Sequence, residues 1–156
     1  MSIKRYGVVA IVPHPDDWKR YPGTDSTPEE RVAAAMSCRF LVIRRSSTVL
    51  APDTLCFAGG GIETGESSEV AIRREYREEL DLNIRVVREI WQMVTPWDVH
   101  LRWFLAELLP GNEIHPAPAE VSDVMWMSIQ ELQQRKDFLV SNLPFFEKIA
   151  SGEILL

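Results

Sequence analysis

Residues 57–82 read FAGGGIETGESSEVAIRREYREELDL, and the other segments of the chain can be understood around this stretch. Gly59–Gly61 and Gly65 place four glycines within seven residues. A cluster of this kind is typical of a tight loop, because glycine adopts positive φ and lets the backbone approach a ligand closely. Its N–H groups can also form a concave nest for an anion.

A helix is predicted directly after the glycines. Ser67 or Ser68 is a suitable N-cap, and residues 69–80 contain neither Gly nor Pro. At about 100° per residue, the helix has one apolar stripe that can face a core. This stripe consists of Ile72, Tyr76 and Leu80.

Charged residues crowd another side of the predicted helix. Arg74, Glu75, Glu78 and Glu79 share an arc of roughly 140°. Like charges at Glu75 and Glu79 destabilise an isolated helix by about 0.2–0.5 kcal/mol. A Glu-rich helix is usually only a solvated face, but the glycines upstream favour a functional interpretation. A divalent cation would compensate the repulsion, so a site for phosphate and a hard metal ion is predicted here.

The stretch resembles the Nudix box, G-x5-E-x7-R-E-U-x-E-E-x-G-U, where U is a bulky apolar residue. The matching positions are Gly60, Glu66, Arg74, Glu75, Tyr76, Glu78, Glu79 and Leu82. Asp81 replaces the usual glycine, Ala58 stands where proline is common, and Tyr76 is larger than the usual leucine. The chain is thus identified as a member of the Nudix hydrolase (MutT-like) superfamily. The resemblance implies one Nudix domain over residues 1–156, with its box at 60–82, folded as an α/β/α sandwich with a mixed central sheet.

The resemblance also implies a metal site. Its ligands would be Glu78, Glu79, Glu75 and the carbonyl of Gly59. Glu75 would be either a ligand or the base that deprotonates the attacking water, and Glu120 is a second candidate base. Ligation by oxygen alone favours Mg²⁺ or Mn²⁺ over zinc.

Other box residues are expected to support this site. Arg74 would hold a glutamate carboxylate through charge-assisted hydrogen bonds, and Glu66 would steady the loop behind the ligands. Gly60 and Gly61 would contact the substrate, and Glu63 has at most a minor role.

The implied activity is metal-dependent hydrolysis of the diphosphate linkage in a nucleoside diphosphate joined to another group. One alternative is a non-catalytic Nudix-like module that binds a nucleotide and regulates a partner. Another is a zinc deacetylase, since Pro13–Asp17 reads PHPDD, but Trp18 replaces the usual acidic residue and no later His-x-x-His follows. Oxidised nucleoside triphosphates, ADP-ribose, nucleotide sugars and dinucleoside polyphosphates all remain open as substrates.

The whole chain constrains partners and location. Its 156 residues suit one domain, and a net charge of −6 with pI near 5.1 argues against general binding of nucleic-acid polymers. No apolar run of about 18 residues or cleavable leader is recognised, so no membrane is expected. Cys38 and Cys56 are expected to be buried free thiols, which favours the cytoplasm. Relatives often form dimers, so a homodimer is a further expectation.

Apolar runs and turn residues predict the remaining elements. Residues 13–30 and 110–118 are expected to be loops, and residues 31–36 a helical turn. Trp103 and Trp126 are expected in the core, whereas Trp18 and Trp97 lie in loops and could stack on a nucleobase. Strands are predicted at 6–12, 38–45, 54–57, 84–94, 101–108 and 124–128, a turn at 130–132 and a closing helix at 143–150.

Overall fold

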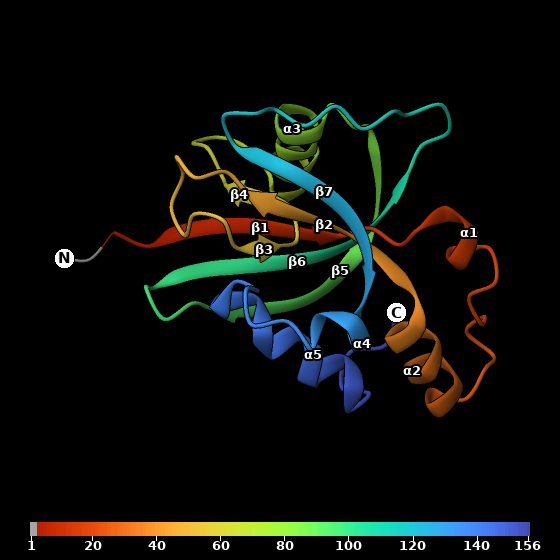
Figure 1. The fold of residues 1–156 in the computed structure, drawn as a ribbon. Coiled ribbons are helices and arrows are strands. Elements are labelled where there is room, and N and C mark those ends of the chain that lie inside the picture. Colours follow the sequence, from red (N-terminus) through yellow and green to blue (C-terminus); the bar gives the residue numbers. More distant parts are fainter. Residues whose placement is uncertain (1–2) are drawn as a thin grey trace.

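The computed structural model describes residues 3–156, and its strands form two sheets (Figure 1). The four-stranded sheet has the order β4-β1-β6-β5, formed by β1 (Arg5–Ile11), β4 (Gly59–Gly61), β5 (Ile84–Val94) and β6 (Val99–Leu108). It is mixed, because β1 runs parallel to β6 and the other pairs are antiparallel. The second sheet is antiparallel with the order β3-β2-β7, formed by β2 (Arg39–Arg45), β3 (Leu55–Cys56) and β7 (Val121–Ser128).

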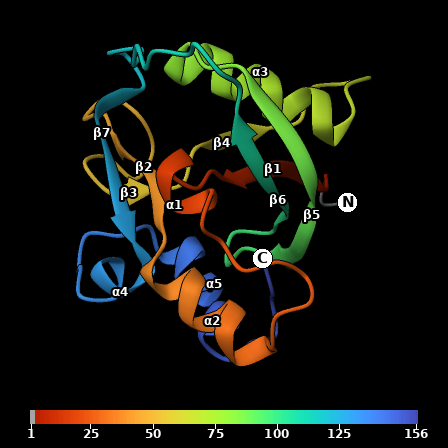
Figure 2. The same cartoon turned by 90° about the vertical axis from the view of Figure 1, so that its right-hand side faces the viewer.

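Helices lie on two sides of these sheets (Figure 2). On one side is α3 (Ser68–Leu80), and on the other are α2 (Pro28–Ser37), α4 (Ile129–Leu132) and α5 (Leu143–Ala150). A four-residue helix, α1 (Pro15–Trp18), and a 3₁₀ turn, Val140–Asn142, complete the set. The predicted α/β class with a mixed sheet is confirmed, although its strands divide between two sheets.

β1 explains how the two cores arise. Alternate residues of a strand point to opposite faces, so a strand buried on both faces reads as one continuous apolar run. Val9 and Ile11 join the core beneath α5, whereas Val8 and Ala10 join the core beneath α3. The first core centres on Trp103, which is fully buried as predicted and stacks on Phe145 with ring centroids 4.8 Å apart.

α3 has the predicted boundaries and orientation. The Ser67 hydroxyl caps its first turn by accepting from the Val70 N–H at 3.2 Å. The stripe of Ile72, Tyr76 and Leu80 is buried, and the Tyr76 hydroxyl donates to the Ala10 carbonyl at 2.8 Å. Asp81, which replaces the usual glycine of the box, ends the helix in the left-handed region at φ 55°. Aspartate tolerates this conformation better than most residues other than glycine. The charged face of α3 is thereby fixed relative to β1.

The expectation of a loop over residues 13–30 was wrong, as was that of a single turn at 31–36. α1 lies within this segment, and α2 is a ten-residue helix that begins at Pro28. The Thr27 hydroxyl accepts from the Glu30 N–H, and the Glu30 carboxylate accepts from the Thr27 N–H. This capping box, with proline at N1, starts the helix. The prolines of residues 13–30 had instead favoured the prediction of a loop.

The glycine cluster is also not the tight loop that was expected. Gly59–Gly61 form β4, paired antiparallel with β1 at the edge of the sheet. Among the four glycines only Gly65 has a positive φ, of 81°. The need for glycine in β4 therefore comes from close approach of neighbouring groups.

The other elements match their predictions within a few residues, with α4 replacing the predicted turn at 130–132. Cys38 and Cys56 are buried and free, as predicted. Across residues 3–156, every helix is too short or too polar to cross a bilayer.

Candidate active site

β4 and α3 approach each other so closely that side chains are excluded from part of β4. A Cβ added at Gly60 would lie 2.4 Å from the carboxyl group of Glu75, and one at Gly59 would lie 2.1 Å from the Val8 carbonyl oxygen. Neither position therefore admits a side chain without displacement of its neighbours. Glycine at Gly60 sets the Glu75 carboxylate directly against the edge of the sheet.

The Arg74 guanidinium organises the carboxylates around it. Its Nε and Nη2 donate to the two oxygens of Glu66 at 2.7 and 2.9 Å, a two-point contact of the kind guanidinium favours. Its Nη1 donates to Glu75 Oε1 at 2.9 Å and to Glu78 Oε2 at 3.1 Å. Its Nη2 also donates to the Gly61 carbonyl at 2.8 Å, which ties α3 to β4. The hydrogen bonds that Arg74 donates lower the pKa of Glu66 to about 2, and donation to Glu66 and Glu75 raises the pKa of Arg74.

Glu79 is the least satisfied charge of the cluster. It is only 8% exposed, and its Oε2 has no hydrogen-bond partner. Burial, with smaller effects from the charges of Glu75 and Glu120, raises the pKa of Glu79 to about 8. An unsatisfied buried acceptor destabilises a fold by about 1–3 kcal/mol, and by more when it is charged. The position of Glu79 thus calls for a cation.

Glu120 reaches the same cluster from a distant part of the chain. The Ala117 N–H donates to the Glu79 carbonyl at 2.8 Å, and the Glu120 N–H donates to the Ala117 carbonyl at 3.0 Å, so this loop is tied to α3. Burial raises the pKa of Glu75, Arg74 opposes that shift, and the charges of Glu78 and Glu120 add to it. Glu120 therefore lies near enough to Glu75 and Glu79 for its charge to affect both carboxyl groups.

The chemistry of this donor set suits a hard divalent ion. All of its groups are carboxylate or carbonyl oxygens, and the Oε2 of Glu79 is buried without a partner. Within residues 3–156, no three Asp, Glu, His or Cys side chains already converge as ligands, and Arg74 engages both Glu75 and Glu78. The expectation of a divalent ion at this site thus rests on the oxygen donors and on the unpartnered Oε2 of Glu79.

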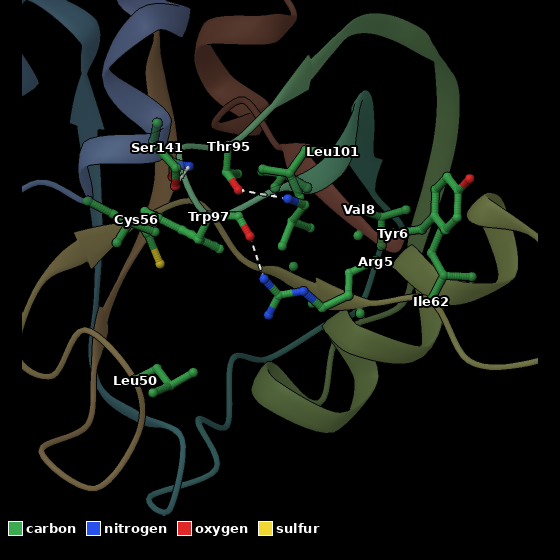
Figure 3. Close-up of a pocket in the computed structure, with 18 of the residues that line it drawn as sticks. Arg5, Tyr6, Val8, Leu50, Cys56, Ile62, Thr95, Trp97, Leu101 and Ser141 are labelled. Carbon is green, nitrogen blue, oxygen red and sulfur yellow. Dashed lines mark hydrogen bonds between the residues drawn. The ribbon is translucent and has the colours of Figure 1, made fainter. Parts of the chain in front are cut away.

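A cavity of about 1240 Å³ opens beside β4 (Figure 3). Gly59–Gly61 form part of its wall, so β4 borders both the cavity and Glu75. Trp97, Leu101 and Leu139 supply apolar walls, and Arg45 supplies a cation. A ligand with an apolar ring system and an anionic tail is the kind of molecule that such a lining accommodates.

Trp97 lies at the mouth of this cavity on the β5–β6 turn and is 45% exposed. The turn is held by the Asp98 N–H, which donates to the Thr95 carbonyl at 3.0 Å. The Val99 N–H donates to the Thr95 hydroxyl at 3.0 Å, and the Arg5 guanidinium donates to the Trp97 carbonyl. The turn that carries Trp97 is therefore braced, and Figure 3 shows the contact of Arg5 with the Trp97 carbonyl.

Several cavity residues were not singled out from the sequence. Arg45 ends the LVIRR strand, and its Nε donates to the Leu50 carbonyl at 2.7 Å while its Nη1 contacts Cys56 Sγ at 3.9 Å. Arg5, Ser141 and Asn142 line the same space from the two ends of the chain. The two arginines that end the LVIRR strand could have indicated Arg45 from the sequence. Arg5, Ser141 and Asn142 carry no such signal, and only the fold brings them to the cavity.

The remaining sequence candidates have structural contacts. The Trp18 indole donates to Glu107 at 2.7 Å, and Trp126 is half-buried against His14. In the PHPDD segment, the His14 ring accepts from the Asp16 N–H at 3.2 Å, and Asp17 accepts from the Arg39 side chain at 2.8 and 2.9 Å. These groups cap α1 and join it to β2, so a helix cap replaces the suggested zinc turn.

Comparisons with known proteins agree with this geometry. A family model described as NUDIX domain matches residues 31–149. A curated relative, the NAD-capped RNA hydrolase NudC of Deinococcus radiodurans, is 30% identical over 84 residues, which are 54% of this chain and 30% of that protein. The nucleoside triphosphatase NudI of Escherichia fergusonii is 28% identical over 100 residues, covering 53% of this chain and 67% of that protein. The chain spans about a third of the length of the first curated relatives that it matches.

Solved structures show the same fold. The MutT protein of Methanosarcina mazei aligns with a TM-score of 0.70 and 16% identity, covering 98% of this chain and 99% of that one. An ADP-ribose pyrophosphatase of Streptococcus suis aligns with a TM-score of 0.63 and 16% identity, covering 96% and 90%. With the NUDIX model matching most of its length and the box carboxylates gathered on α3 against β4, this chain belongs to the Nudix family.

Proposed function

We propose that the protein is a Mg²⁺- or Mn²⁺-dependent hydrolase that cleaves the diphosphate linkage of a nucleoside diphosphate joined to another group. The observation that carries this proposal is the buried, unpartnered Oε2 of Glu79 within a carboxylate cluster on α3, beside the strand β4 that lines the cavity. A module that only binds nucleotides has no need of this arrangement, so the regulatory alternative is less well supported.

Glu78 and Glu79, with the Gly59 carbonyl, would hold the ion. When bound, a divalent ion supplies neutralisation of the diphosphate charge and Lewis-acid activation for displacement at phosphorus. The nucleoside would occupy the cavity, with its base against Trp97. The phosphates would pass along the backbone of Gly60 and Gly61, which line the cavity.

Two residues of the cluster would have distinct roles in the reaction: one would be the base for the attacking water, and the other would position that base. Glu75 would accept the proton of the water, because burial raises its pKa and one of its oxygens is fixed by Arg74. Arg74 would be a positioning residue for Glu75, with Glu66 fixing Arg74 in turn. Glu120 is the alternative base. Loss of a general base lowers kcat by about 10²- to 10⁴-fold, so Glu75→Gln should show that loss and Glu120→Gln should show much less.

The names of the relatives suggest which substrates to test. They include hydrolases of NAD-capped RNA, nucleoside triphosphates and ADP-ribose, all of which contain a phosphoanhydride. Purified protein with Mg²⁺ or Mn²⁺ should turn over at least one class among nucleoside triphosphates, ADP-ribose, NAD, nucleotide sugars and dinucleoside polyphosphates.

Two variants make this panel decisive. Glu78→Gln should abolish turnover, whereas Glu147→Gln, which removes an exposed carboxylate on α5, should leave it unchanged. Tight nucleotide binding without turnover in either metal would refute the enzymatic proposal and favour the regulatory module. A homodimer and a cytoplasmic location remain predictions, which light scattering and cell fractionation test.

A further inference from the structure

The hairpin that joins β2 to β3 brings an exposed leucine to the cavity. Leu50 belongs to this hairpin, lines the cavity and is 87% exposed (Figure 3). A side chain this exposed contributes little to the fold, and its apolar surface is free to pack on a ligand. Single exposed leucines are common on protein surfaces, so the case for Leu50 depends on how its hairpin is held.

The backbone beside Leu50 adopts an uncommon conformation. Ala51 and Asp53 have φ of 49° and 62°, in the left-handed region that residues other than glycine adopt infrequently. Ala51 also lacks the short polar side chain that lets Asp or Asn adopt this region more readily. Such conformations persist where the surrounding structure imposes them, and they are concentrated at ligand clamps and active sites. The hairpin therefore has a fixed shape that its own residue types do not favour.

Side-chain donors on both strands impose this shape. The Arg45 Nε donates to the Leu50 carbonyl at 2.7 Å, and the Thr54 hydroxyl donates to the Ala51 carbonyl at 2.7 Å. Both contacts are made to backbone oxygens, so they fix the position of Leu50 and leave its side chain free. Arg45 itself lines the cavity, which joins the support of the hairpin to the cavity wall.

The root of the hairpin is fixed as well. The hydroxyls of Ser46 and Thr48 donate to the Ala119 carbonyl at 2.8 and 3.1 Å. Just before them, the pairing of β2 with β7 shifts register between Arg44 and Arg45. A bulge of this kind changes the direction of a side chain and is common beside active sites. Here it accompanies the entry of Arg45 into the cavity wall, from which that arginine supports the hairpin.

Trp97 is the counterpart of Leu50 in the same cavity. The two residues come from the hairpins β5–β6 and β2–β3, which belong to different sheets. Tyr6 also lines the cavity, but its ring packs on His100 with centroids 5.4 Å apart and lies beside Ile62 in Figure 3. A base has two flat faces, and proteins hold an extruded base between aromatic and apolar side chains. Trp97 and Leu50 are side chains of these two kinds.

We propose that Leu50 is a specificity-determining residue that packs on the nucleobase of the substrate together with Trp97, so that the two hairpins clamp the base at the cavity. This inference rests on the function proposed above and deepens it. An apolar clamp selects diphosphates that carry a base over those that lack one, because a sugar phosphate or inorganic pyrophosphate offers the same anionic group without a flat apolar face.

Binding measured without hydrolysis tests this inference on the full chain. Affinities for AMP, GMP, CMP and UMP would be measured by isothermal titration calorimetry, with ribose 5-phosphate as the ligand that lacks a base. The variant is Leu50→Ser, and Leu50→Met is its conservative counterpart. The matched control is Leu109→Ser, which removes a leucine that is 40% exposed and lies outside the cavity lining. Thermal unfolding should give the same midpoint for Leu50→Ser and the wild type, because the Leu50 side chain is exposed.

Leu50→Ser should bind the preferred nucleotide about tenfold more weakly, as expected for loss of about half of the burial of a leucine side chain. Its affinity for ribose 5-phosphate should equal that of the wild type, and Leu50→Met and Leu109→Ser should retain their affinity for the nucleotide. In a double-mutant cycle, Leu50→Ser should weaken binding less when Trp97→Ala is already present, because both side chains pack on the same base.

Equal losses of affinity for the nucleotide and for ribose 5-phosphate would show that Leu50 acts through the shape of the hairpin, and would overturn the inference. An unchanged nucleotide affinity in Leu50→Ser, an additive cycle, or no binding of any of the four nucleotides would overturn it as well. Nucleotide binding that depends on Leu50, without turnover of any substrate in the panel, would support the clamp and count against the proposed function.

Discussion

At the scale of single residues, Glu79 shows how a functional requirement opposes stability. Its Oε2 is buried without a partner, and burial raises its pKa to about 8. For a carboxyl group whose folded pKa is raised, stability is fully present below the unfolded value near 4.5 and is lost as pH rises through the folded value. The metal-free protein therefore becomes less stable between about pH 4.5 and 8 as this carboxylate ionises.

Replacing Glu79 by glutamine should therefore stabilise the metal-free protein. At pH 8 the free energy of unfolding of Glu79→Gln, measured with urea, should exceed that of the wild type by about 1–3 kcal/mol. Mg²⁺ should stabilise the wild type and have little effect on this variant. Equal responses to Mg²⁺ in both proteins would show that Glu79 does not hold the ion.

Gly60 and Gly61 offer a matched pair of substitutions. A Cβ at Gly60 would meet the Glu75 carboxylate at 2.4 Å, whereas a Cβ at Gly61 has no atom within 4 Å. Gly60→Ala should displace Glu75 and lower kcat by about 10²-fold or more, as misplacement near 1 Å does. Gly61→Ala should retain most of the activity in the same steady-state assay. Equal losses would mean that backbone flexibility, and not space for Glu75, determines the need for glycine.

At the scale of elements, α1 is joined to β2 by one ion pair. Asp17 accepts from Arg39, and those hydrogen bonds lower the pKa of Asp17 from 3.8 to about 2. A depressed carboxyl pKa stabilises the fold above the unfolded value, and this contribution is lost as pH falls from about 4 to 2.

Asp17→Asn should remove this contribution. The variant should be less stable than the wild type by about 1 kcal/mol at pH 6, after allowance for solvent screening, with the difference shrinking toward pH 2. Urea unfolding at several pH values measures it, with Asp25→Asn at an exposed turn as the control. A difference that does not depend on pH would exclude the ion pair as its cause.

Elements with strong local signals could be predicted, and those defined by distant partners could not. The apolar stripe of α3 and the alternating burial of β1 are encoded in short segments. β4 contains only glycines, so no side-chain pattern marks it as a strand, and its pairing with β1 defines it. For α2, the signal at Thr27, Pro28 and Glu30 was present but was outweighed by the prolines around it.

At the scale of the whole molecule, the fold joins a motif to a cavity that the sequence does not reveal. The carboxylates of α3 lie in one segment and could be predicted together. Arg5, Arg45, Trp97 and Asn142 come from separate parts of the chain, and they line one space only because β1, β2, the β5–β6 turn and the 3₁₀ turn converge. Local sequence therefore predicts the chemistry of the site better than its choice of substrate.

Trp97 tests the assignment of the cavity to the nucleoside. Stacking of a base on an aromatic side chain is worth about 1–3 kcal/mol by alanine substitution. Trp97→Ala should therefore raise KM by about tenfold or more and leave kcat almost unchanged, because the carboxylates of α3 are not among the residues that line the cavity with Trp97. Trp18→Ala, on α1 outside the cavity lining, is the control. A fall in kcat at constant KM would place Trp97 in the chemical step instead.

The most direct test of the central claim is the position at which water oxygen enters the products. Hydrolysis of the preferred substrate in H₂¹⁸O, analysed by mass spectrometry after a single turnover, should place one ¹⁸O on a phosphate group of one product. This result is required if the carboxylate cluster directs water to phosphorus. Incorporation into the group released from the phosphate, which indicates cleavage of a carbon–oxygen bond, would contradict the account.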